Sequence, residues 1–141
     1  MAVDIKLNLC YNIVKYITNN IMEAFMELGK VLNLINGELL IGDINRSMNT
    51  AFSSDLMSDV LAFVEEDTVL ITGLINNQVI RTAEILDLKA IIFVRGKLPA
   101  EDVIKMAKMK DITLVRTEFT LFETSGILYK NGLGALKIYH E

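Results

Sequence analysis

Two short apolar runs on either side of a helical segment constrain the fold of this chain more than any other feature. Residues 69–71 and 90–94 are apolar without polar alternation, which is typical of strands buried on both faces. The segment between them repeats apolar residues at helical spacing, at Val79, Ile80, Ala83, Leu86 and Leu88. This pattern predicts a parallel β-α-β unit with a right-handed crossover.

Strands that are apolar on both faces must be covered by helices on both faces of their sheet. We therefore predict an α/β fold with three α/β/α layers around a mostly parallel central sheet. A chain of 141 residues is most simply one such domain. Its hydrophobic content of 52% is high for so small a chain, and a buried homodimer interface would account for part of it.

Charge and composition argue against several classes of protein. The net charge of -4 does not suit nucleic-acid binding, which needs a clustered basic face. The single cysteine, Cys10, excludes an internal disulfide and a cysteine-based zinc site. No apolar run approaches the roughly 20 residues of a membrane span, and the N-terminus lacks a signal-peptide pattern. We therefore expect a cytoplasmic protein without a membrane span.

Residues 1–36 carry an apolar pattern of their own. Large apolar side chains recur in steps of three and four, at Leu9, Ile13, Ile17, Ile21, Phe25, Leu28, Val31 and Ile35. The pattern predicts one long or two consecutive amphipathic helices, broken at residues 18–20, that pack in the core or in a dimer. A membrane-surface helix is an alternative, although its polar face lacks the expected Lys and Arg residues. Another alternative is that Met26 is the natural start of the protein.

These patterns predict three regions, namely a helical extension (1–36), an α/β domain (37–132) and a C-terminal tail (133–141). Within the domain, apolar runs predict further strands at 38–41, 48–52 and 112–115. The tail is predicted to add an edge strand through Leu136, Ile138 and Tyr139.

Three more helices are predicted from capping signals. Residues 53–55, Ser-Ser-Asp, are expected to cap a helix that buries Leu56, Met57, Val60, Leu61 and Val64. A second helix is predicted over 99–110, with Pro99 in its first turn. A third is predicted over 120–131, with a capping box of Thr120 and Glu123 and a stop at Gly132.

The sequence lacks the motifs of the common catalytic classes. It contains no phosphate-binding P-loop, no dinucleotide-binding glycine motif and no nucleophile elbow. The only histidine, His140, lies next to the C-terminus, and we interpret it as a solvated tail residue. We therefore expect no catalytic residue, no metal site and no cofactor.

Polar and cationic residues follow several of the predicted strands. Ligands of open parallel sheets bind at the carboxyl ends of the strands, where helix N-termini also direct their amide donors. We predict a site for a small anion at this edge, formed by Ser54, Asp55, Asp59, Thr72, Gly73, Asn76, Arg95, Gly96, Arg116 and Thr117. The alternative is that the glycines only permit turns and the arginines are solvated.

Several stretches resemble the DRTGG domain family in its small stand-alone form. The most specific are SSDLMSDVL, TGLINNQVIRTAE, FVRGKLP and TLFETSGILY, within a resemblance that covers residues 37–132. The resemblance implies an α/β/α fold similar to the N-terminal domain of HPr kinase. It also implies kinship with modules found beside phosphotransacetylase domains and between CBS domains of pyrophosphatases. The Asp-Arg-Thr-Gly-Gly string that names the family is matched only in part, by Thr72-Gly73 and Arg95-Gly96.

Three functions remain open at this point. The first is a non-catalytic, homodimeric regulatory module that senses a protein partner or a small anionic ligand, with an adenine nucleotide as one candidate. The second is a purely structural domain for protein interaction or dimerisation. The third is a small enzyme acting on phosphorylated metabolites, which needs Asp55, Asp59, Arg95 or Arg116 to converge on one pocket.

Overall fold

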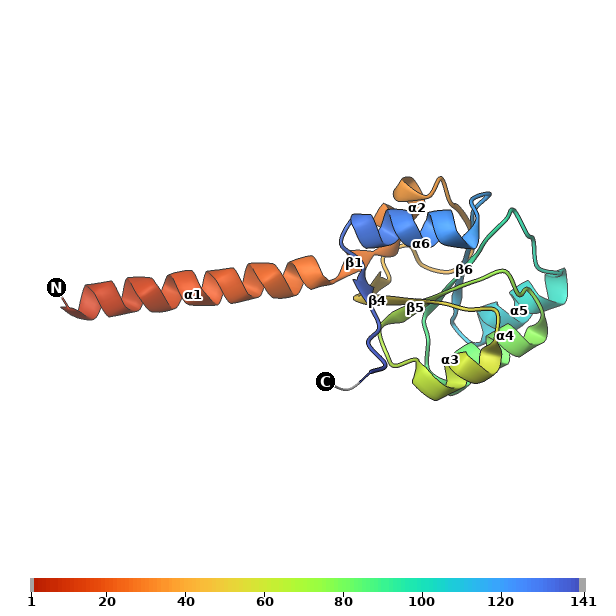
Figure 1. The fold of residues 1–141 in the computed structure, drawn as a ribbon, viewed down its shortest axis with the longest axis horizontal. Helices are drawn as coiled ribbons and strands as arrows, with labels where there is room; N and C mark the ends of the chain where they lie inside the picture. The colour runs from red at the N-terminus through yellow and green to blue at the C-terminus, as the bar shows by residue number, and fades with distance from the viewer. Residues whose placement is uncertain (1, 140–141) are drawn as a thin grey trace.

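The computed structural model describes residues 2–139, with side chains for 2–18 and 25–139, and confirms the three-layer α/β/α fold (Figure 1). Its helices are α1 (Ala2–Ala24), α2 (Leu28–Leu34), α3 (Met57–Phe63), α4 (Asn77–Ile85), α5 (Glu101–Met109) and α6 (Leu121–Lys130). Its strands are β1 (Met26–Glu27), β2 (Glu38–Ile41), β3 (Ser47–Met48), β4 (Thr50–Ser53), β5 (Thr68–Thr72), β6 (Ala90–Phe93), β7 (Thr113–Arg116) and β8 (Gly134–Ala135).

The central sheet has six strands in the order β2-β7-β6-β5-β4-β8. Its neighbouring strands are parallel except for β2, which runs antiparallel to β7. The predicted central unit is confirmed, because β5 and β6 are parallel neighbours with Leu70 opposite Ile91. The carboxyl ends of β4, β5, β6 and β7 therefore lie along one edge of the sheet.

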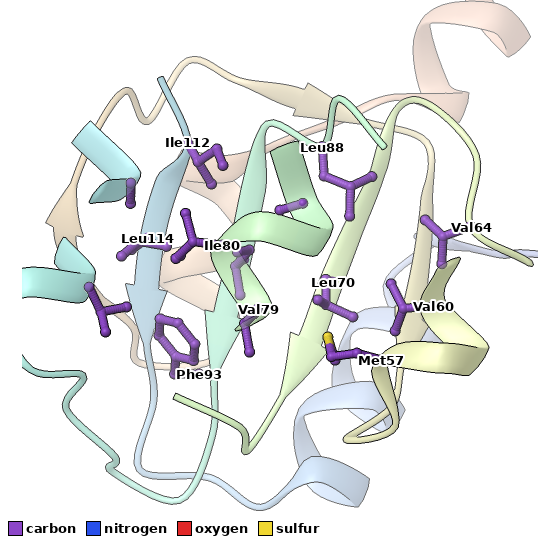
Figure 2. Packing of buried hydrophobic residues seen from close by; sticks show 14 residues of the cluster. Met57, Val60, Val64, Leu70, Val79, Ile80, Leu88, Phe93, Ile112 and Leu114 are labelled. Carbon is purple, nitrogen blue, oxygen red and sulfur yellow. The ribbon is translucent and has the colours of Figure 1, made fainter. Parts of the chain in front are cut away.

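Helices α3, α4 and α5 cover one face of the sheet (Figure 1). Alternate strand residues, including Leu70 of β5 and Phe93 of β6, point to this face, as Figure 2 shows. They belong to one cluster with Val60 of α3 and with Val79 and Ile80 of α4, and all five side chains are fully buried. Burial of this face supplies a large part of the apolar area removed from water.

Helices α2 and α6 cover the opposite face (Figure 1). Ile71 of β5 and Ile92 of β6 point to this side and belong to a second cluster with Leu28 of α2 and Leu128 of α6. Since both faces of β5 and β6 are buried, neither strand has a solvated side. This double burial explains why the two apolar runs of the sequence show no polar alternation.

The N-terminal region forms two consecutive helices, which is one of the two predicted arrangements. The predicted break at residues 18–20 is wrong. Helix α1 continues through these residues and ends before β1. Strand β1 pairs with β3, and this pairing places Met26 opposite Met48. Both methionines are buried, so their packing fixes the position of the break.

The two N-terminal helices have different surroundings. Leu28 and Val31 of α2 are fully buried in the core. Helix α1 projects away from the layers, and its described apolar side chains, Ile13 and Ile17 among them, are exposed (Figure 1). Among residues 2–139, no helix combines the length and apolarity that crossing a membrane requires.

Two predictions around β4 are wrong, because contacts with distant residues decide the local structure there and the apolar and capping patterns of the sequence do not. The predicted strand 48–52 is divided into β3 and β4 at Asn49, whose amide donates to the Asp67 carbonyl oxygen. Helix α3 begins at Met57, so residues 53–55 do not cap it. Its buried stripe is narrower than predicted, since Leu56 and Leu61 are exposed.

The C-terminal predictions are correct for the helix and for an edge strand in the tail, but the residues predicted to form that strand are wrong. Thr120 Oγ1 accepts a hydrogen bond from the Glu123 amide at 3.2 Å, and Gly132 follows α6 with a φ of +103°. The tail pairs with the sheet through β8, because the Gly134 amide donates to the Asn49 carbonyl oxygen. Residues 136–139 lie outside any strand.

Two isoleucines on α4 test which face of the helix supports the fold. Ile80 is 0% exposed and Ile85 is 72% exposed. Ile80→Ala should lower the free energy of unfolding by about 2–5 kcal/mol, because it leaves a cavity in the core. Ile85→Ala should change it by less than about 0.5 kcal/mol. Urea unfolding of both variants measures the difference, and equal losses would contradict the layer assignment.

Candidate functional site

Asp55 joins the carboxyl ends of two neighbouring strands. It follows β4, and its Oδ1 accepts hydrogen bonds from Thr72 Oγ1 at 3.0 Å and from the Gly73 amide at 2.7 Å, both at the end of β5. Thr72 is fully buried, and its Oγ1 also accepts a hydrogen bond from the Leu74 amide at 3.1 Å. The carboxylate therefore organises the backbone turn that leaves β5.

The environment of Asp55 favours its charged form. The pKa of its carboxyl group is lowered, most of all by the hydrogen bond from the Gly73 amide. Burial opposes this shift, whereas the Thr72 hydroxyl and the charges of Arg95 and Lys97 add to it. Asp55 is therefore a carboxylate at neutral pH.

The turn after β6 has an uncommon backbone conformation that fixes Arg95. Arg95 and Gly96 are both left-handed, with φ values of 62° and 65°. The Arg95 amide donates to the Phe119 carbonyl oxygen and the Gly96 amide to the Thr117 carbonyl oxygen, each at 2.8 Å. A left-handed non-glycine residue is unfavourable, so these bonds from the loop after β7 hold Arg95 in place.

Two cationic side chains meet at Gly73. A Cβ atom on this residue would lie 2.5 Å from Nη2 of Arg95, so the missing side chain leaves room for the guanidinium. Lys97 Nζ donates a hydrogen bond to the Gly73 carbonyl oxygen at 3.0 Å. We refer to Asp55, Thr72, Gly73, Arg95 and Lys97 together as the Gly73 site.

The Gly73 site has more positive than negative charge. Arg95 and Lys97 face the single carboxylate of Asp55. In the part of the chain whose side chains are described, Arg95 takes part in no ion pair, and it is exposed to solvent. A guanidinium with free donors beside an ammonium group is a suitable place for a phosphate or carboxylate to bind.

Three of the predicted site residues lie near this edge without entering these contacts. Ser54 Oγ accepts a hydrogen bond from the Leu56 amide at 3.0 Å and shapes the turn before α3. Asn76 Oδ1 accepts a hydrogen bond from the Gln78 amide at 3.1 Å, so this side chain is the N-cap of α4. Asp59 is exposed in the first turn of α3, and it makes no hydrogen bond to any described side chain.

Arg116 and Thr117 belong to a separate group beside β2. Arg116 Nε pairs with Glu38 Oε2 at 2.6 Å, so its charge is already neutralised. Thr117 is buried, and its Oγ1 donates to the Ile35 carbonyl oxygen at 2.7 Å. These residues line a small cavity of about 150 Å³, and the Glu118 carboxylate reaches from it over Gly96. The structure thus divides the predicted residues into two groups.

Lys97 belongs to the Gly73 site and was not among the predicted residues. The signal was present in the sequence, because Lys97 lies in the stretch FVRGKLP directly after Arg95-Gly96. Its role depends on the left-handed turn, which directs Lys97 back to β5, and no periodicity reveals such a turn.

Two other features limit the choice of chemistry. Among residues 2–139, no group of three His, Cys, Asp or Glu side chains is placed to hold a metal ion. An apolar groove of about 310 Å³ lies beside α6, and Ser53 Oγ and Ser125 Oγ form a hydrogen bond of 2.7 Å in it. Its exposed aromatic walls are Phe122 and Tyr129.

The fold and the site define a three-layer α/β protein with a cationic site at the strand edge. By sequence, no family model and no curated protein matches the chain. By structure, it is similar to the CBS and DRTGG domains of the regulatory region of Clostridium perfringens pyrophosphatase, solved with the activator diadenosine tetraphosphate. The TM-score is 0.67 at 18% identity, over 79% of this chain and 49% of that chain. The chain therefore spans about half the length of that region, and the similarity shows a related fold.

The Asp55 bonds predict a pH-dependent stability. Because the pKa of Asp55 is lowered in the folded state, its contribution is complete above the unfolded value of about 3.9 and is lost as the pH falls through the folded value. Asp55→Asn should therefore be less stable than the wild type at pH 7, with a difference that shrinks below about pH 4.

Urea unfolding across this pH range measures that difference. Asp59→Asn is the matched control, because it removes a nearby carboxylate that makes none of these bonds, and it should cost less stability at neutral pH. A difference for Asp55→Asn that persists unchanged to about pH 2 would contradict the assignment.

Proposed function

We propose that this protein is a non-catalytic, homodimeric regulatory module that senses a small phosphorylated ligand at the Gly73 site. The observation that carries the proposal is the convergence of Arg95 and Lys97 on Gly73, beside the carboxylate of Asp55. We also propose that the module belongs to the DRTGG family and acts in the cytoplasm.

Each group of the site has a defined part in binding. The guanidinium of Arg95 presents a planar fork that suits two phosphate oxygens, and Lys97 adds a point charge. The Oδ1 atom of Asp55 is occupied by Thr72 and Gly73, whereas its Oδ2 accepts no hydrogen bond from the described side chains. This free oxygen suits a ligand hydroxyl, so the site favours a ligand with both phosphate and hydroxyl groups, such as an adenine nucleotide.

The chemistry of the same residues favours sensing over catalysis. A general base works best with a pKa near the operating pH, and the pKa of Asp55 is shifted in the opposite direction. The similar region of the C. perfringens pyrophosphatase is regulatory, and its activator is a nucleotide. The similarity in fold supports a regulatory role for this chain. The proposal does not include pyrophosphatase activity.

A second function, protein interaction or dimerisation without a ligand, is favoured by one specific observation. Helix α1 exposes large apolar side chains along the described part of its length, including Leu7 and Val14. Such a surface suits a protein partner. The two functions predict different responses to nucleotides.

A thermal-shift screen of the full chain against AMP, ADP, ATP and diadenosine tetraphosphate tests the proposal. A ligand at 100 times its Kd adds about 2.7 kcal/mol, which should raise the Tm by roughly 5 to 10 °C. Arg95→Ala and Lys97→Ala should remove most of the shift, because each deletes a cation of the site.

Arg116→Ala is the matched control, because its guanidinium is paired with Glu38 in the other group. It should retain the shift. A flat screen with every ligand would contradict the sensing proposal and leave protein interaction as the better account. Equal losses in Arg95→Ala and Arg116→Ala would contradict the assignment to the Gly73 site.

Gly73→Ala tests whether the absent side chain matters. The new methyl group would meet the end of the flexible Arg95 side chain, so the guanidinium should be displaced at little cost in stability. We expect unchanged unfolding in urea together with loss of the nucleotide-dependent shift. Retained binding in a stable Gly73→Ala variant would show that the ligand does not need the Arg95 guanidinium to lie beside Gly73.

A further inference from the structure

Helix α1 has a large apolar surface that the rest of the described chain leaves uncovered. It is 23 residues long and projects from the α/β layers (Figure 1). The described apolar side chains of α1 that are exposed to solvent are Val3, Ile5, Leu7, Leu9, Tyr11, Ile13, Val14, Tyr16 and Ile17. An apolar surface of this extent is uncommon on a lone soluble chain and indicates an interaction surface.

The exposed residues are arranged for packing against another helix. Val3, Leu7, Cys10, Val14 and Ile17 follow one another at steps of four, three, four and three, which is the spacing of a coiled-coil seam. Residues of this spacing stay on one side of a helix when two helices supercoil around each other. We call this line of residues the α1 seam.

A narrow polar stripe lies on the opposite side of α1. It contains Asp4, Asn8, Asn12 and Lys15, and Asn12 Nδ2 donates a hydrogen bond to Asn8 Oδ1 at 3.3 Å. Helices that lie on membrane surfaces carry a polar face rich in Lys and Arg. The stripe has one acid and one base, so a protein surface is the better match.

The charges and length of α1 fit a second copy of the same helix. Asp4 and Glu23 balance Lys6 and Lys15, so two copies do not repel each other by net charge. A helix of 23 residues is about 34 Å long, which is enough for three heptads. We propose that α1 packs against α1 of a second copy through the α1 seam, forming the dimer interface. This inference rests on the homodimer in the proposed function and is independent of the ligand.

Light scattering of the full chain tests the interface. The wild type should have twice the chain mass of 15.8 kDa, and Leu7→Glu or Val14→Glu should halve the measured mass by placing a charge in the seam. Asn8→Glu is the matched control on the polar stripe and should remain dimeric. Because these side chains are exposed in the single chain, circular dichroism and thermal unfolding should show that all variants keep the α/β domain folded.

A spin-label distance separates this interface from any other dimer. Residue 12 lies near the middle of α1, on the polar stripe, so in both a parallel and an antiparallel pair it lies level with its counterpart on the outer side of the partner helix. Labels on a Cys10→Ser, Asn12→Cys chain should lie about 20 to 35 Å apart, given the width of two packed helices and the label arms.

The outcomes distinguish the proposed homodimer from the proposed α1 seam. A dimer that persists in Leu7→Glu and Val14→Glu, or label distances well beyond that range, would overturn the α1 seam and leave the homodimer standing. A monomeric wild type at tens of micromolar would overturn both. Sedimentation of a monomeric wild type with phosphatidylcholine–phosphatidylserine vesicles would assign α1 to a membrane surface instead, again overturning the proposal.

Discussion

Strands β5 and β6 are buried on both faces, and the rest of the structure follows from this constraint. Leu70 and Ile71 are neighbours in β5, yet they belong to separate clusters on opposite sides of the sheet. Each cluster needs its own layer of helices, and parallel strands need long connections that cross over the sheet. The same geometry brings the carboxyl ends of four strands to one edge, where loops are free to carry polar groups.

At that edge, two connected sets of hydrogen bonds position the Gly73 site. Asp55 ties the end of β4 to the end of β5. The loop after β7 holds Arg95 in its left-handed turn and, through Thr117 Oγ1, also binds the Ile35 carbonyl oxygen at the end of α2. The site is therefore assembled from three strand ends and linked by hydrogen bonds to the helix that follows α1 and β1. A ligand that moves this loop would therefore act on the hydrogen bond to the end of α2.

The sequence predicts the layers better than it predicts the site. Continuous apolar runs predict β5 and β6, because strands buried on both faces consist almost entirely of apolar residues, and helical spacing of apolar residues predicts α4. The break after α1 could not be placed, since it depends on Met26 meeting Met48, a contact between distant residues. Likewise, Arg95 and Arg116 look equivalent after their strands, and only the pairing of Arg116 with Glu38 distinguishes them. Which strand ends meet, and which charges are already paired, is decided by tertiary structure.

The most direct test of the central claim is a titration of the isotope-labelled protein with ADP, followed through backbone amide resonances in NMR spectra. The amides of Gly73, Arg95, Gly96 and Lys97 belong to the turns that form the site. We predict that these resonances shift first and saturate together, while those of Phe122 and Tyr129 beside the apolar groove remain in place. Saturable shifts confined to the groove, or no shifts with millimolar nucleotide, would contradict a phosphate-binding site at Gly73.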